Sequence, residues 1–245
     1  MLTLNWGSAT DVGRVRNQNE DSLWASESLF LVADGMGGHA AGEVASGLAV
    51  TEIGRIAESA PLHAEDIITA IWRANEAILR AGHERGDRFG LGTTVTGVAV
   101  VSAEGDDQWA VFNVGDSRVY RFIEGQLSQV TVDHSEVQEL VTAGHLRPEE
   151  ARFHPRRNVV TRSLGSDPPP IADLWVLRPR AGDRFLVCSD GLTGELEDAE
   201  IEQLLAEFSD PQEAADALVR AANAAGGHDN VTAIVVDLVG HDPIV

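Results

Sequence analysis

One arrangement of residues recurs three times in the sequence: a largely apolar run stops at an aspartate that is followed by a small residue. The runs at 29–33, 111–115 and 185–189 lead into Asp34, Asp116 and Asp190. A single Asp followed by Gly or Ser is typical of a turn, and Asp also caps helices well. One occurrence alone would not indicate a chemical role for the aspartate. Repetition at the ends of predicted strands indicates a shared site.

Other acidic residues can join these aspartates. Asp229 stands directly before an apolar run, and Glu20-Asp21 precedes another. Carboxylates gathered at one edge repel each other unless a cation neutralises them. Oxygen ligands without cysteine or clustered histidine favour Mg²⁺ or Mn²⁺ over zinc. Gly35 lets the backbone approach closely, so its carbonyl oxygen is a further candidate ligand. The sequence therefore predicts a site for hard divalent cations.

The elements that must position this site can be predicted from hydrophobic spacing. Helical spacing predicts three helices, at 40–58, 64–84 and 211–224. Runs rich in β-formers predict strands at 29–33, 93–101, 109–114, 118–123, 184–188 and 231–238. Two consecutive helices followed by several adjacent strands exclude regular βαβ alternation and favour mostly antiparallel sheets. Because some strands are apolar nearly throughout, both of their faces should be covered. Two packed sheets flanked by helices, an α+β fold, satisfy that requirement.

No internal repeat or long low-complexity segment divides the chain, so we expect one domain over residues 1–245. Glu124-Gly125-Gln126 predicts a hairpin turn. Between residues 133 and 165 the pattern weakens into polar sequence with one short helix candidate at 135–143. We expect this segment, called the flap below, to lie at the surface.

Charge and composition exclude several classes of function. The formal net charge of −21 repels nucleic acid phosphates and anionic membranes. All 18 basic residues are arginine, so mechanisms that use a lysine are excluded. A single cysteine, Cys188, a polar first stretch and the lack of a long apolar segment predict a soluble, cytoplasmic protein.

Six motifs, in this order, resemble those of the metal-dependent protein phosphatases of the PP2C type, particularly their compact bacterial members. They are Arg16-Asn17-Gln18-Asn19-Glu20-Asp21, Val32-Ala33-Asp34-Gly35-Met36-Gly37-Gly38-His39, Gly92-Thr93-Thr94, Val114-Gly115-Asp116-Ser117-Arg118, Ser189-Asp190-Gly191-Leu192 and Asp229-Asn230. The resemblance covers nearly the whole chain. It implies a four-layer α-β-β-α sandwich with two central sheets and a metal site in the cleft between sheet ends. It also implies hydrolysis of phosphoserine and phosphothreonine in proteins by a water or hydroxide that bridges two metal ions.

The resemblance implies roles for individual residues in a core site for two Mn²⁺ or Mg²⁺ ions. Asp34 would bridge both ions. The Gly35 carbonyl and a water held by Glu20 would complete the shell of one ion, and Asp190 and Asp229 would hold the other. We therefore expect Asp34, Asp190 and Asp229 to be the principal catalytic ligands.

Further residues are expected to surround that core. Asp21 would orient metal-bound waters, and Asp116 with Asp190 would support a weaker third metal. Arg16 lies four residues before Glu20, and its planar guanidinium suits bidentate contact with a substrate phosphate. The neighbouring Arg14 is the alternative phosphate ligand. The non-functional interpretation of Arg16 is a surface salt bridge.

The proton donor is where the sequence departs from the family pattern, because Met36 replaces a histidine that eukaryotic members carry after Asp-Gly. His39 is the candidate general acid, since its reference pKa of about 6.5 suits the role. A histidine that caps the following helix is the alternative.

Other reactive-looking residues have simpler interpretations. Cys188 lies inside an apolar strand without a paired base, so we expect it in the core rather than as a nucleophile. His134, His145 and His154 fall in the flap, where a solvated loop histidine is more common than a substrate contact.

The resemblance favours an enzyme that opposes bacterial Ser/Thr kinases, with phosphoprotein substrates that include the kinases or their targets. One alternative is a phosphatase of an anti-sigma-factor antagonist, although such enzymes usually carry sensory domains, for which this length leaves no room. A second is a catalytically silent pseudophosphatase that only binds phosphoproteins, against which the intact acidic set argues. No coiled coil is evident, so we expect a monomer.

Overall fold

The computed structural model describes residues 2–37, 41–58, 61–85, 91–103 and 105–241. The strands are β1 (Leu2–Asp11), β2 (Asp21–Ala25), β3 (Leu29–Met36), β4 (Gly92–Thr93), β5 (Val95–Ala103), β6 (Asp106–Val114), β7 (Arg118–Ile123), β8 (Gln126–Gln129), β9 (Asp173–Leu177), β10 (Arg184–Cys188) and β11 (Val231–His241). The helices are α1 (Ala41–Gly54), α2 (Ala64–Arg85), α3 (Glu136–Thr142), α4 (Pro148–Ala151), α5 (Asp190–Glu195), α6 (Asp198–Glu207) and α7 (Pro211–Ala225), with a 3₁₀ turn at Arg55–Glu58.

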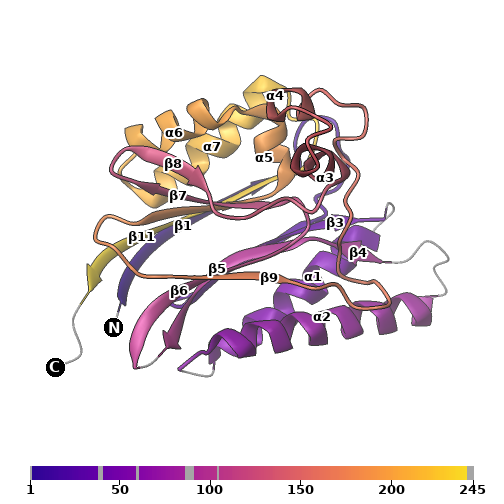
Figure 1. Cartoon of the computed structure of the whole chain (residues 1–245), viewed down its shortest axis with the longest axis horizontal. Coiled ribbons are helices and arrows are strands. Elements are labelled where there is room, and N and C mark those ends of the chain that lie inside the picture. The colour runs from indigo at the N-terminus through magenta and orange to yellow at the C-terminus, as the bar shows by residue number, and fades with distance from the viewer. Residues whose placement is uncertain (1, 38–40, 59–60, 86–90, 104, 242–245) are drawn as a thin grey trace.

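The strands form two sheets. One has the order β1-β11-β10-β7-β8, and the other has β2-β3-β5-β6-β9 with β4 paired to β3. All described ladders are antiparallel. Figure 1 shows the sheets stacked face to face, with α1 and α2 against the second sheet and α5, α6 and α7 against the first. The predicted α+β class and four-layer sandwich are confirmed.

Three hydrophobic layers separate these four layers of structure, and β3 shows why. Its residues 29–33 are fully buried. Leu29, Leu31 and Ala33 pack with α1 and α2, whereas Phe30 and Val32 point into the layer between the sheets. Side chains alternate between the two faces of a strand, so a strand apolar throughout needs cover on both sides. The same alternation holds in β10, where Leu186 and Cys188 face the α5–α7 side and Phe185 and Val187 face the other sheet.

A buried carboxylate ties the two sheets together at the start of β10. Asp183, just before β10, accepts hydrogen bonds from Trp109 of β6 at 3.0 Å and from Arg121 of β7 at 2.6 Å. Because Trp109 and Arg121 belong to different sheets, this carboxylate fixes the sheets relative to each other.

The predicted helices and strands are found with small shifts of their ends. The first helix ends at Gly54 and continues only as the 3₁₀ turn, and its predicted start at Ala40 lies outside the described residues. The predicted strand at 93–101 is divided into β4 and β5. The hairpin turn is confirmed between β7 and β8, with Glu124 and Gly125 both at positive φ. Three strands, β1, β8 and β9, and three helices, α4, α5 and α6, were not predicted, and β2 was indicated only as an apolar run after Asp21.

The flap connects the two sheets between β8 and β9 and carries α3 and α4. The predicted helix at 135–143 is confirmed as α3, and its N-cap Ser135 accepts a hydrogen bond from the backbone N–H of Gln138 at 3.3 Å. None of the helices in the described ranges combines the length and the apolar character that crossing a bilayer requires.

Candidate active site

The predicted aspartates converge at one end of the sandwich, from strands of both sheets. Asp34 in β3 is paired with Asp21 in β2, and its carboxyl shares a hydrogen bond with that of Asp190. Asp190 is the first residue of α5, directly after β10, whereas Asp116 follows β6 and Asp229 precedes β11. The two sheets thus place five carboxylates in one cluster, named the aspartate cluster below.

Burial and mutual repulsion make the carboxyl groups of Asp21, Asp34, Asp116 and Asp190 hard to ionise. Burial, and then the nearby charges of Asp21 and Asp190, raise the pKa of Asp34 well above its ordinary value. Burial also raises the pKa of Asp21 to about 7, and burial together with Asp190 raises that of Asp116 to about 8. The pKa of Asp190 is raised by burial and by the charge of Asp229. The cluster therefore holds unfavourable negative charge that a cation would stabilise.

The donor set fits hard divalent cations. Oδ1 of Asp21 is buried and has no hydrogen-bond partner among the residues that the structure describes, while its Oδ2 accepts from Ser189 at 2.8 Å and Thr232 at 2.6 Å. In the described ranges, no three His, Cys, Asp or Glu side chains converge tightly enough to enclose a cation by themselves. Waters commonly complete the shells of such ions, so few direct carboxylate ligands suffice.

Hydroxyl groups fix the position of Asp34. Its backbone N–H donates to Oγ1 of Thr94 at 3.0 Å, and its carbonyl accepts from Thr93 at 2.8 Å. Thr94 in turn shares a 2.8 Å hydrogen bond with Ser117, beside Asp116. Gly115 adopts a φ of +117°, and a Cβ there would overlap Thr94. These contacts explain why Thr93-Thr94 and Gly115 accompany the acidic residues in the sequence.

Glu20 lies over a close backbone contact between Gly35 and Gly42. The N–H of Gly35 donates to the Glu20 carbonyl at 3.2 Å. A Cβ added at Gly42 would lie 2.7 Å from Oε2 of Glu20 and 2.8 Å from the carbonyl oxygen of Gly35. The Glu20 carboxylate and the Gly35 carbonyl are therefore near neighbours.

Asn230 holds the loop that carries Arg16 and Glu20. Its Oδ1 accepts from the backbone N–H of Glu20 at 2.8 Å, and its Nδ2 donates to the carbonyls of Val12 and Gln18, both at 2.9 Å. In the sequence, Asn230 stands out only as part of a motif and has no predicted role. Its polar type beside Asp229 was the available signal, but its partners lie more than 200 residues away.

The structure separates the two candidate phosphate ligands. The guanidinium of Arg16 is 2.7 Å from Asp229, and its side chain remains 53% exposed. Arg14 donates from Nε to the carbonyl of Asn223 at 2.8 Å and from its backbone to Gly227 at 2.7 Å. Only Arg16 of this pair reaches the aspartate cluster.

The other singled-out residues have mixed outcomes. His39 lies outside the described residues. Cys188 is fully buried, and burial raises the pKa of its thiol to about 12, as expected of a core residue. The expectation of a solvated histidine was wrong for His134, which is 5% exposed. It accepts from the N–H of Gly115 and faces Asp173, so it anchors the base of the flap.

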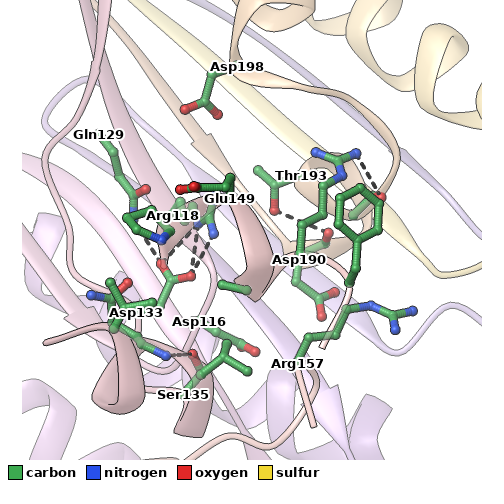
Figure 2. Close-up of a pocket in the computed structure, with 18 of the residues that line it drawn as sticks. Asp116, Arg118, Gln129, Asp133, Ser135, Glu149, Arg157, Asp190, Thr193 and Asp198 are labelled. Atoms are coloured by element: carbon green, nitrogen blue, oxygen red, sulfur yellow. Dashed lines mark hydrogen bonds and ion pairs between the residues drawn. The ribbon is translucent and has the colours of Figure 1, made fainter. Parts of the chain in front are cut away.

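A groove of about 660 Å³ opens beside the aspartate cluster, between the flap and the start of α5 and α6. Figure 2 shows Asp116 and Asp190 among its lining residues, with Arg118 bonded to Asp133 behind them. The cluster is therefore accessible from this side to a molecule the size of a short peptide.

Comparison with known proteins decides the family. The profile described as Protein phosphatase 2C matches residues 16–225, which include every member of the aspartate cluster except Asp229. The chain belongs to this family. A serine/threonine protein phosphatase, PstP, of Mycobacterium tuberculosis is 38% identical over 98% of the chain, which spans only 46% of that relative's length. The serine/threonine phosphatase stp of Listeria monocytogenes is 38% identical over 93% of both proteins.

Solved structures of this protein phosphatase 2C family have the same fold. The M. tuberculosis phosphatase PstP superimposes with a TM-score of 0.90 at 38% identity, over 97% of this chain and 99% of that one. A PstP catalytic domain in complex with two manganese ions gives a TM-score of 0.87 at 36% identity, over 98% of this chain and 100% of that one.

Proposed function

We propose that this protein phosphatase 2C member hydrolyses phosphoserine and phosphothreonine in proteins. The observation that carries the proposal is the aspartate cluster, in which buried carboxyl groups with raised pKa values lie beside the accessible guanidinium of Arg16. The relatives described as Ser/Thr phosphatases support the same reaction.

Two divalent cations are proposed at the cluster, as in the manganese complex of the PstP catalytic domain. Asp34, Asp190 and Asp229 would hold them directly, with the Gly35 carbonyl and Glu20 on one side. When bound, such a pair supplies an activated water and charge neutralisation for an in-line displacement at phosphorus. Whether Mn²⁺ or Mg²⁺ serves is decided by measurement of activity with each ion.

The protein's own groups would orient the water and the phosphate. Asp21, fixed by Ser189 and Thr232, presents its unpartnered Oδ1 as an acceptor for waters at the ions. Asp116 would support a third, weaker ion with Asp190, a role supported by the charge of Asp190, which contributes to the raised pKa of Asp116.

Arg16 would bind the phosphate. Its guanidinium already pairs with a carboxylate in the cluster, and a phosphate offers the same bidentate acceptor geometry with more charge.

His39 stays the proposed general acid. If His39→Ala slowed phosphopeptides and p-nitrophenyl phosphate equally, that role would be excluded, because the aryl leaving group needs no proton.

We further propose that residues 1–245 act as one catalytic domain in the cytoplasm, as a monomer, and oppose Ser/Thr kinases. The family match across 16–225 supports a single catalytic unit. The binding-only alternative is disfavoured because the full acidic set is present and clustered.

The substrate class is tested by phosphate release from three peptides of one sequence that carry phosphoserine, phosphothreonine or phosphotyrosine. With Mn²⁺ present, we expect turnover of the first two and much slower turnover of the third. Preference for phosphotyrosine would overturn the assignment, and binding without release would favour the pseudophosphatase.

A further inference from the structure

The groove beside the aspartate cluster has two facing walls. One wall is the part of the flap from Ser135 to Asn158, and the other runs from Thr193 to Ala199 at the start of α5 and α6. Asp116 and Asp190 line its inner end, so the groove is continuous with the catalytic centre. Its volume of about 660 Å³ falls in the range of sites that hold ligands of several residues' bulk.

The flap wall carries an aromatic side chain that the protein itself leaves uncovered. Phe153 lines the groove and is 78% exposed. Exposed aromatic rings beside a cavity offer apolar contact area at low conformational cost. The ring can therefore cover the aliphatic part of a ligand's side chain.

Both walls also carry carboxylates. Glu149 projects from the flap, and Glu197 and Asp198 lie at the start of α6. Glu149 forms an ion pair with Arg147 at 3.2 Å, in which both side chains are more than 60% exposed and so interact weakly. Glu197 caps α6 and forms no ion pair in the described part of the chain.

The arginines of the groove offset only part of this charge at its outer end. Arg118 is bound to Asp133 at 2.7 Å. Arg152 donates to the carbonyls of Gly194 at 3.2 Å and Leu196 at 3.1 Å, and because carbonyls are uncharged, its positive charge offsets one of the three carboxylates on the walls. Arg157 lies on the Asp190 side in Figure 2, toward the catalytic end. The outer part of the groove is thus acidic on two sides.

We propose that this groove binds the polypeptide flank of the phosphorylated residue and favours an arginine or lysine there. The methylene stem of that residue packs on Phe153 and its cationic end lies between Glu149 and Glu197, since long basic side chains combine these two contacts. This inference rests on the proposed phosphatase function and names the class of its substrates.

Two phosphothreonine peptides that differ by one Arg-to-Gln replacement test the proposal, with the replacement made in turn on either side of the phosphothreonine. Each kcat/KM is divided by that of the same protein for p-nitrophenyl phosphate, which has no flank. The unaltered protein should prefer the Arg peptide about fivefold on one side, the effect of two partly exposed charge pairs. In Glu149→Gln/Glu197→Gln the ratio should fall toward one, while the glutamine that replaces Glu197 keeps an oxygen for the α6 cap.

A matched control removes two carboxylates from α2, on the far side of the molecule, as Glu65→Gln/Glu76→Gln. It should keep the preference of the unaltered protein. Phe153→Ala should lower the normalised kcat/KM of both peptides about tenfold, through lost apolar contact. No preference in the unaltered protein, a preference that survives in Glu149→Gln/Glu197→Gln, or equal loss in the α2 control would overturn the groove assignment. Absence of any phosphopeptide turnover would instead overturn the proposed function on which it rests.

Discussion

Arg16 reaches the aspartate cluster from the loop between β1 and β2 and keeps more than half of its side chain exposed. Replacement of Arg16 by alanine should lower kcat/KM for a phosphothreonine peptide about 10- to 100-fold, because a charge-assisted hydrogen bond to phosphate contributes roughly 1.5–3 kcal/mol. Steady-state phosphate release measures the effect.

Two further variants give this experiment its controls. Arg16→Lys should recover only part of the loss, since an ammonium group lacks the planar fork of guanidinium. Arg73→Ala removes an exposed arginine of α2 and should leave kcat/KM unchanged. Full activity in Arg16→Ala would exclude this arginine from phosphate binding.

At the residue scale, the carboxylates were predictable and their partners were not. Asp34, Asp116 and Asp190 follow apolar runs, and strand ends in a packed sheet fold tend to meet at an edge, so their type and position were both informative. Arg14 and Arg16 are two residues apart, and only contacts with Asn223 and Asp229, far away in sequence, distinguish them.

One side chain of a different element helps to fix the position of the loop of residues 12–20. Asn230, just before β11, makes three hydrogen bonds to this loop. Asn230→Ala should misplace Arg16 and Glu20, and it should raise both KM and the Mn²⁺ concentration for half-maximal activity. Lost hydrogen bonds of a partly buried group cost about 1–3 kcal/mol, so Tm should also fall by several degrees.

A control variant with a similar loss of folding stability separates an effect on the position of the loop from an effect on stability. Ile201→Val in α6 deletes a buried methylene far from the loop and should cost about 0.5–1.5 kcal/mol. It should lower Tm without a change in the Mn²⁺ requirement. If Asn230→Ala behaved like Ile201→Val, the positioning role of Asn230 would be wrong.

At the element scale, prediction succeeded where burial is strong. Strands β3 and β10 are covered on both faces, so their apolar runs are unmistakable. Edge strands β1, β8 and β9 lie partly in solvent, and β1 and β8 mix apolar with polar residues, which weakens their signal. Helix α5 has only six residues and begins at Asp190, where a turn is equally consistent with the sequence.

At the scale of the whole molecule, several carboxyl groups lie close together where the two sheets meet. The pKa values of Asp21 and Asp116 are about 7 and about 8 in the folded protein, against about 3.9 for an unfolded aspartate. Between these values the folded state binds more protons than the unfolded state. The contribution of these two groups to stability without metal is therefore fully present below the unfolded pKa and is lost as pH rises through the folded values.

Thermal unfolding between pH 5.5 and 8.0 tests this linkage. With EDTA present, Tm should decrease as pH rises. Saturating Mn²⁺ should raise Tm most at pH 8.0, because cations bind the ionised carboxylates and compete with protons. Asp21→Asn/Asp116→Asn should flatten the EDTA profile. A Tm that rises with pH in EDTA would contradict the clustered, buried state of these groups.

The central claim is that the aspartate cluster hydrolyses phosphoproteins with divalent cations. Phosphate release from a phosphothreonine peptide, followed with Mn²⁺, with EDTA and after Mn²⁺ is restored, tests it most directly, with Asp34→Asn alongside. We predict turnover with Mn²⁺, its loss in EDTA, its recovery on restoration, and a decrease of more than about 100-fold in Asp34→Asn whenever Mn²⁺ is present. Turnover that persists undiminished in EDTA, or in Asp34→Asn, would contradict it.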